Sequence, residues 1–122
     1  MTQPDSPGVR ERRLSRRFPP KPTTRATCHR GTLRIRRDLV RAVHDLSETG
    51  ACLLLGEEVA RGEPVELGLQ AAAWGQEVRV PGIVMWAVAG PDGTCRAGVL
   101  FSRCLSLTAL GELCLLECEL PR

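Results

Sequence analysis

Glycine and proline divide this chain, from Thr23 onward, into short apolar or alternating segments. Short segments of this kind, bounded by turn-forming residues, are typical of β-strands. Six such segments with short connections predict a mainly all-β fold, a small six-stranded antiparallel barrel or sandwich. The predicted strands are Thr23–His29, Asp38–Leu46, Ala51–Leu55, Pro64–Leu69, Gln76–Ala89 and Thr94–Phe101.

Turn residues refine this prediction. Pro81-Gly82 predicts a bend or bulge within the long fifth strand, because proline cannot donate to a sheet ladder. Residues 90–93, Gly-Pro-Asp-Gly, suit a tight turn before the sixth strand. Residues 31–37 stay ambiguous, since they can extend either neighbouring strand.

The carboxyl-terminal end changes to a helical period. The apolar positions there predict a helix over about residues 105–119, with Ser106 or Thr108 as the N-cap. Gly111 weakens this helix by about 1 kcal/mol relative to alanine. A wide apolar stripe favours a helix that plugs an open end of the barrel, and docking of a second copy or a partner is the alternative. The stripe comprises Leu105, Leu107, Leu110, Leu113, Cys114, Leu116, Cys118 and Leu120.

The amino-terminal end has a different character. Residues 1–9 predict a disordered leader, because they are polar and contain two prolines and a glycine. Residues 10–22 form a basic arm, whose Phe18-Pro19-Pro20-Lys21-Pro22 segment must be extended. Residues 23–122 then form one domain, as expected for a chain of 122 residues.

Composition excludes several classes of protein. A hydrophobic share of 43% with 25% charged residues is that of a globular protein and excludes collagen-like and wholly disordered chains. The uncharged apolar stretch Pro81–Pro91 is far shorter than the roughly 20 residues that cross a bilayer. The amino-terminal segment also lacks the apolar region of a signal peptide. We therefore expect a cytoplasmic protein without a membrane span.

Six cysteines raise the question of disulfides or a metal site. No CxxC pair occurs, and the chain has only two histidines to complete a zinc set. We expect reduced, mostly structural thiols, no metal and no disulfide. The cysteines are Cys28, Cys52, Cys95, Cys104, Cys114 and Cys118.

The net charge of +3 hides a division of the chain. Residues 1–44 contain twelve Lys and Arg against three Asp and Glu, a net charge of +9, whereas residues 45–122 carry −6. This asymmetry indicates an anionic partner for the amino-terminal part, with a solvated basic tail as the alternative.

The first motif is the arginine cluster of residues 12–17, Arg-Arg-Leu-Ser-Arg-Arg. Arg13 and Arg17 are four residues apart and lie on one side of the segment. Guanidinium groups bind phosphates and the O6/N7 edge of guanine bidentately. Arg12 and Arg16 have the same spacing, so the register is not unique.

The second motif is residues 45–50, Asp-Leu-Ser-Glu-Thr-Gly, at the end of a predicted strand. Asp45 and Ser47 are two residues apart, and we expect them to project together as an acceptor-rich patch. Gly50 would permit a positive φ at the turn. A carboxylate can accept from guanine N1–H and N2–H, so both motifs together could read one guanine. A plain Asx or Ser turn is the alternative.

The order of these motifs, with Gly98-Val99-Leu100-Phe101 closing a glycine-rich hairpin, resembles the PilZ domain, the cyclic di-GMP receptor module of bacteria. The resemblance covers about residues 10–104. It implies a six-stranded antiparallel PilZ-type β-barrel with a C-terminal α-helix. It also places Trp86 among the core aromatics, and we expect this residue to pack inside the barrel with Val84, Val99 and Phe101.

The resemblance also implies roles for individual residues. Arg13 and Arg17 match the RxxxR pair that holds phosphates and guanine, and Arg12 matches the preceding arginine. Phe18-Pro19 favours this register, because an aromatic–proline pair commonly follows the second arginine. The interval from Arg17 to Asp45 is longer than usual, which an insertion around residues 30–37 would explain. The DxSxxG residues, which grip guanine and shape the turn, are Asp45, Ser47 and Gly50.

We therefore expect a non-enzymatic receptor that binds cyclic di-GMP as a ligand, uses no cofactor, and changes conformation to signal to a protein partner. The resemblance implies motility or secretion machinery as that partner, and a homodimer stays open. A PilZ-like adaptor without nucleotide and a nucleic-acid-binding module are alternatives, although the few aromatic residues argue against the latter. An enzyme is least expected, because strand neighbours His44 and Asp45 should face opposite sides.

Overall fold

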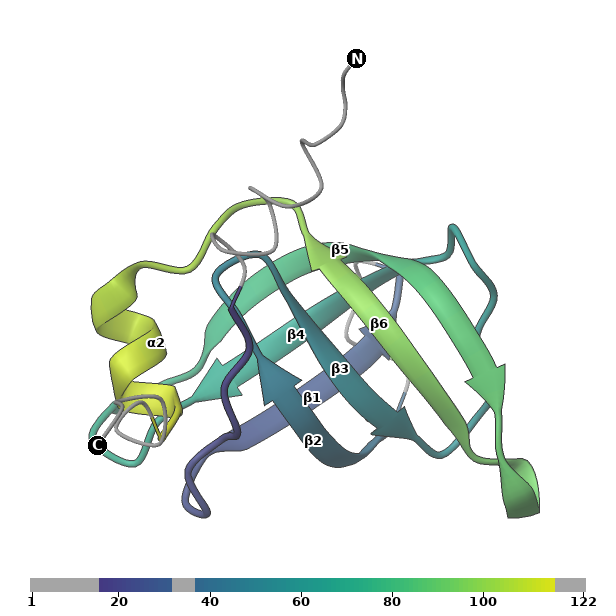
Figure 1. The fold of residues 1–122 in the computed structure, drawn as a ribbon, viewed down its shortest axis with the longest axis horizontal. Coiled ribbons are helices and arrows are strands. Elements are labelled where there is room, and N and C mark those ends of the chain that lie inside the picture. Colours follow the sequence, from purple (N-terminus) through teal and green to yellow (C-terminus); the bar gives the residue numbers. More distant parts are fainter. Residues whose placement is uncertain (1–15, 32–36, 116–122) are drawn as a thin grey trace.

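In the computed structural model, which describes residues 16–31 and 37–115, six antiparallel strands form one sheet that curls into a nearly closed barrel (Figure 1). The order of strands around the sheet is β1-β4-β5-β6-β3-β2, so β1 and β2 face each other where the barrel closes. The predicted mainly β architecture is confirmed. The strands are β1 Arg25–Arg30, β2 Val40–Leu46, β3 Gly50–Leu55, β4 Pro64–Gln70, β5 Val78–Ala89 and β6 Cys95–Phe101.

The barrel core follows from the alternation of side chains along these strands. In β6 the residues Cys95, Ala97, Val99 and Phe101 point inward and are buried, whereas Arg96 and Leu100 are exposed. Burial of several large aliphatic side chains, each worth about 1.5–3 kcal/mol, provides the main driving force for closure. The largest fully buried side chains include Leu46, Leu53, Leu55, Leu67, Leu69, Leu110 and Leu113.

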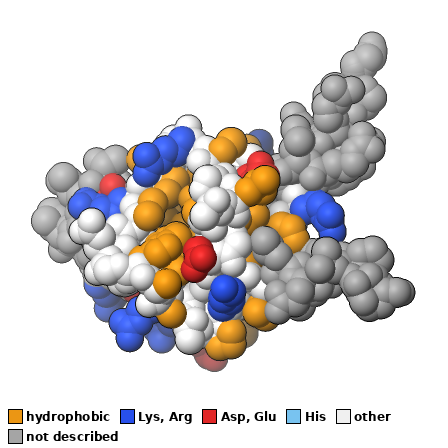
Figure 2. Space-filling view, turned by 90° about the vertical axis from the view of Figure 1, so that its left-hand side faces the viewer, with side chains coloured by type: hydrophobic (Ala, Val, Ile, Leu, Met, Phe, Trp, Pro, Cys, Tyr) orange, Lys and Arg blue, Asp and Glu red, His pale blue; other side chains and the backbone are white. Residues whose placement is uncertain are grey.

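The carboxyl-terminal helix is shorter than predicted. Helix α2 spans Leu107–Leu113, and its N-cap Ser106 accepts from the Ala109 amide at 3.0 Å, as expected for one of the two candidate caps. The helix ends because the chain beyond it pairs with the arm: Cys114 forms a β-bridge with Pro20, and the Leu115 amide donates to the Pro19 carbonyl at 2.9 Å. Residues 116–119 of the predicted helix lie outside the described residues. Seen from the α2 side of the molecule, hydrophobic side chains lie among charged ones on the described surface (Figure 2). No helix in the described ranges is both long and apolar enough to span a membrane.

The irregularity in β5 lies at a different place from the predicted one. Pro81 keeps its register opposite Glu66, and its carbonyl accepts from the Ser102 amide at 2.9 Å. The register shift lies between Val84 and Trp86 instead. The turn after β5 is as predicted: η1, Pro91–Gly93, contains Asp92 with φ 59°.

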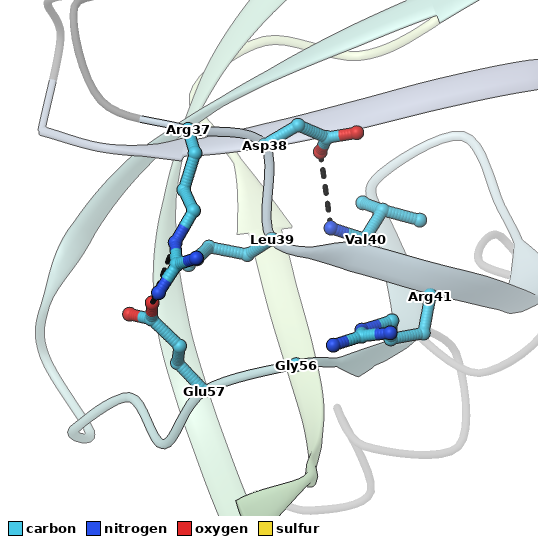
Figure 3. A pocket seen from close by; sticks show the side chains of 7 residues that line it. All are labelled: Arg37, Asp38, Leu39, Val40, Arg41, Gly56 and Glu57. Atoms are coloured by element: carbon cyan, nitrogen blue, oxygen red, sulfur yellow. Dashed lines mark hydrogen bonds and ion pairs between the residues drawn. The ribbon is translucent and has the colours of Figure 1, made fainter.

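One end of the barrel is tied by a charge network. Arg37 donates through Nε and a terminal nitrogen to Glu57 at 3.0 and 2.7 Å (Figure 3). Arg30 forms ion pairs with Glu57 and Glu63. The hydrogen bond to Glu63 raises the pKa of Arg30, and that from Arg37 lowers the pKa of Glu57. A hollow of about 270 Å³ lies beside Arg37 and Arg41. Arg30 and Arg37 are already paired with Glu57 and Glu63 of the β3–β4 connection, so we interpret this charge network as structural.

Candidate functional site

The described part of the basic arm runs extended along the end of β2. Phe18 and Leu46 exchange two backbone hydrogen bonds, of 2.8 and 3.0 Å. Further along the arm, the Lys21 amide donates to the Leu113 carbonyl at 2.8 Å. These hydrogen bonds fix the arm between β2 and the end of α2, and the prolines account for its extended course. Arg12 and Arg13 lie outside the described residues.

This path brings the two sequence motifs together. An Arg17 terminal nitrogen donates to Asp45 Oδ1 at 2.9 Å. Of the two side chains, Arg17 is 55% exposed and Asp45 22%. The pair therefore lies at the surface, where both groups can exchange partners with solvent or with a ligand.

Ser47 is occupied within its own turn. Its hydroxyl accepts from the backbone amides of Thr49 and Gly50 at 3.2 and 3.1 Å, and the side chain is almost fully buried. The expected shared patch of Asp45 and Ser47 is thus divided: Asp45 faces Arg17, and Ser47 holds the turn. The turn arrangement matches the Ser-turn alternative.

Gly50 is required by close approach of the backbone. It is not among the described residues with positive φ, contrary to the expectation. A Cβ at this position would overlap the Val99 carbonyl oxygen on β6. Glycine therefore lets β3 begin directly against β6, which places the Ser47 turn beside the outer face of the sheet.

A row of four residues crosses this outer face. Asp45 on β2 pairs with Cys52 on β3, Cys52 with Gly98 on β6, and Gly98 with Trp86 on β5. The Trp86 indole covers Gly98, since a Cβ on Gly98 would overlap the ring. Side chains in one such row are neighbours on one face of the sheet. The row therefore joins the second motif to an aromatic side chain.

Trp86 is 38% exposed, so the prediction that it packs in the core is wrong. Its expected neighbours Val84, Val99 and Phe101 are buried as predicted. The register shift between Val84 and Trp86 is the cause, because an extra residue reverses the alternation and turns the indole outward.

A shallow hollow of about 90 Å³ lies among these elements. It collects Arg17 from the first motif and Ser47 and Gly50 from the second, with Trp86 in its wall. Sequence reasoning missed Trp86, Met85 and Leu100 as lining residues. One signal in the sequence could have indicated an exposed aromatic residue. Trp86 lies in a long uncharged stretch of β5, and the neighbouring strand β6 contains Gly98, which leaves room for a large side chain. The remaining lining residues are Thr49, Ala51, Gly98 and Val99.

The cysteines do not form a second site. Within residues 16–31 and 37–115, five cysteines are free, and no group of three His, Cys, Asp or Glu side chains could hold a metal ion. Burial raises the pKa of Cys28 to about 12 and that of Cys114 to about 11. These thiols therefore stay protonated and serve as packing groups.

Comparison with known proteins shows the family to which the chain belongs. No curated protein and no solved structure matched the chain. The family model of the PilZ domain, a family of cyclic di-GMP receptors, matches residues 11–115. This range contains both motifs, all six strands and α2. The chain therefore belongs to the PilZ domain family.

Proposed function

We propose that this protein is a receptor for cyclic di-GMP that binds the dinucleotide over the hollow and signals to a protein partner. The observation that carries the proposal is that Arg17, Ser47 and Gly50, from two motifs far apart in the sequence, line one hollow beside Trp86. Membership of the PilZ family supports the same ligand.

Each side chain has a chemical role toward this ligand. Arg17 would donate to a phosphate or to the O6/N7 edge of guanine. Asp45 would accept from guanine N1–H and N2–H, since an ionised carboxylate offers only acceptors. Trp86 would supply a flat apolar wall on which one base stacks, an interaction worth about 1–3 kcal/mol per base in other nucleotide-binding proteins. Ser47 and Gly50 would act by shaping the turn.

The Arg17–Asp45 ion pair suggests how binding changes the protein. An exposed ion pair contributes only about 0–1 kcal/mol, whereas a hydrogen bond to a charged group contributes about 1.5–3 kcal/mol. A ligand that gives both groups new partners would therefore open the pair. The arm, which contacts β2 and the end of α2, would transmit this change.

The wider setting is part of the proposal. The family resemblance supports a cytoplasmic receptor whose partner belongs to motility or secretion machinery. Arg12 and Arg13 would add phosphate contacts next to Arg17.

Calorimetric titration of the purified chain with cyclic di-GMP tests the proposed function, with GTP and cyclic AMP as controls. We expect saturable binding of cyclic di-GMP and no binding of GTP or cyclic AMP. Absence of binding would contradict the receptor role and favour the adaptor alternative.

A further inference from the structure

Beside the row that contains Trp86, two basic side chains meet on the outer face of the barrel. A terminal nitrogen of Arg96 on β6 lies 3.3 Å from His44 Nε2 on β2, and both residues are exposed. The β2 register shifts between Val43 and Asp45, so His44 is the extra residue at this point. Strict alternation, which predicted opposite faces for His44 and Asp45, is interrupted there, and His44 reaches the outer face.

Arg96 lies close to Gly98, one of the residues that line the hollow of about 90 Å³. Arg96 and Gly98 lie two residues apart on β6 and share the outer face, which separates their Cα atoms by about 7 Å. The Cys52 thiol lies between Asp45 and Gly98 in the row described above, and charged groups on both sides of it affect its pKa. Burial and Asp45 raise the pKa of Cys52, and Arg96 and Arg17 act in the opposite direction. Both guanidinium groups are therefore within electrostatic range of one point on this face.

Arg96 differs in its partner from four arginines that ion pairs already engage. Arg17, Arg30, Arg37 and Arg79 each form an ion pair with a carboxylate. In the described part of the chain no carboxylate pairs with Arg96, whose side-chain contact is with the His44 ring. A neutral imidazole that accepts from Arg96 restrains the guanidinium without neutralising it. The charge of Arg96 thus stays available to an anion.

We propose that Arg96 is a further ligand-binding residue, which donates to a phosphate of the bound dinucleotide from the β6 side of the hollow, with His44 as its positioning residue. This inference rests on the proposed function and assigns a specific contact within it. Arg17 and Arg96 would then hold the ligand from two sides, with the base on Trp86 between them. The planar fork of arginine suits a phosphodiester, which offers two oxygens.

Titration of cyclic di-GMP into wild type, Arg96→Gln and Arg25→Gln tests this contact. Arg25 is an exposed arginine on β1, which lies on another part of the barrel, so both variants lose the same charge. We expect the Kd to rise about tenfold or more for Arg96→Gln and less than twofold for Arg25→Gln. Arg96→Lys, which keeps the charge but loses the fork, should fall between wild type and Arg96→Gln, and it replaces Arg96→Gln if that variant does not fold.

A double-mutant cycle tests the role of His44. His44→Ala should weaken binding about threefold in wild type and have no effect in the Arg96→Gln background. Equal Kd values for wild type and Arg96→Gln, or equal losses in both glutamine variants, would overturn the inference and leave the proposed function intact. Absence of binding by wild type itself would overturn both.

Discussion

Arg17 and Asp45, 28 residues apart in the sequence, form an ion pair of 2.9 Å that joins the basic arm to the end of β2. The pair matters because its two members come from the two motifs that the sequence singled out. Arg17 lines the hollow of about 90 Å³ that has Trp86 in its wall, and the ion pair holds the Asp45 carboxylate beside Arg17.

Arg17→Ala should weaken cyclic di-GMP binding by about 1.5–3 kcal/mol, the range for hydrogen bonds to charged groups. Its thermal stability should change little, since the side chain is 55% exposed and its ion pair contributes at most about 1 kcal/mol. Calorimetry and thermal unfolding measure the two quantities, with Arg25→Ala as the matched control. Binding equal to that of wild type would show that this arm is not part of the site. We expect a similar loss for Arg13→Ala, whose position lies outside the described residues.

Trp86→Ala should reduce binding by about 1–3 kcal/mol, as stacking requires, and leave a folded protein. In contrast, Leu53→Ala should cost about 2–5 kcal/mol of unfolding free energy, because Leu53 is fully buried. Urea unfolding compares the two variants. If Trp86→Ala were as destabilised as Leu53→Ala, the indole would belong to the core.

The strands could be predicted because their signals are local. Alternation and turn residues fix where each strand lies, and the proposed ends differ from the observed ones by a few residues at most. The outward position of Trp86 could not be predicted in the same way, since it depends on the β5 register shift against Gly98. The end of α2 was missed for a related reason: contacts with Pro19 and Pro20 of the arm replace the helical hydrogen bonds.

For the site, residue types were more predictable than their roles. The sequence indicated Ser47 and Gly50, but a hydroxyl directed into its own turn and a glycine required by the Val99 carbonyl are tertiary facts. Residue chemistry and family resemblance predicted that both motifs serve one ligand. The ion pair between Arg17 and Asp45 was not predicted, because no periodicity relates an arm to a strand so far along the chain.

Ser47→Ala should lower the unfolding free energy by about 1–3 kcal/mol, because two partly buried backbone amides lose their acceptor. Binding should weaken as the turn loosens. Ser106→Ala removes a serine of similar local function at the N-cap of α2 and should leave binding unchanged. A Ser47→Ala protein with unaltered stability would show that the hydroxyl does not hold the turn.

Cys28 should resist alkylation in the folded protein, because burial raises its pKa to about 12, while the exposed Cys104 reacts. The raised pKa also predicts the pH dependence of stability. The unfolded thiol ionises near pH 9 and the folded one does not, so its stabilising contribution is complete below pH 9 and is lost as the pH rises toward 12. Iodoacetamide labelling at pH 8 with peptide mass spectrometry checks the reactivity. Equal labelling rates for the two cysteines would contradict the buried position of Cys28.

The most direct test of guanine recognition is a matched titration of wild type and Asp45→Asn with cyclic di-GMP and cyclic di-AMP at fixed salt. If charge alone governed binding, removing a carboxylate near the phosphates would strengthen it. The site described here predicts the reverse, because Asn offers one acceptor where the carboxylate offers two. We expect wild type to prefer cyclic di-GMP, and Asp45→Asn to lose about 1–3 kcal/mol for that ligand and little for cyclic di-AMP. Tighter binding of cyclic di-GMP by Asp45→Asn would contradict guanine reading and reduce the basic arm to a general anion-binding segment.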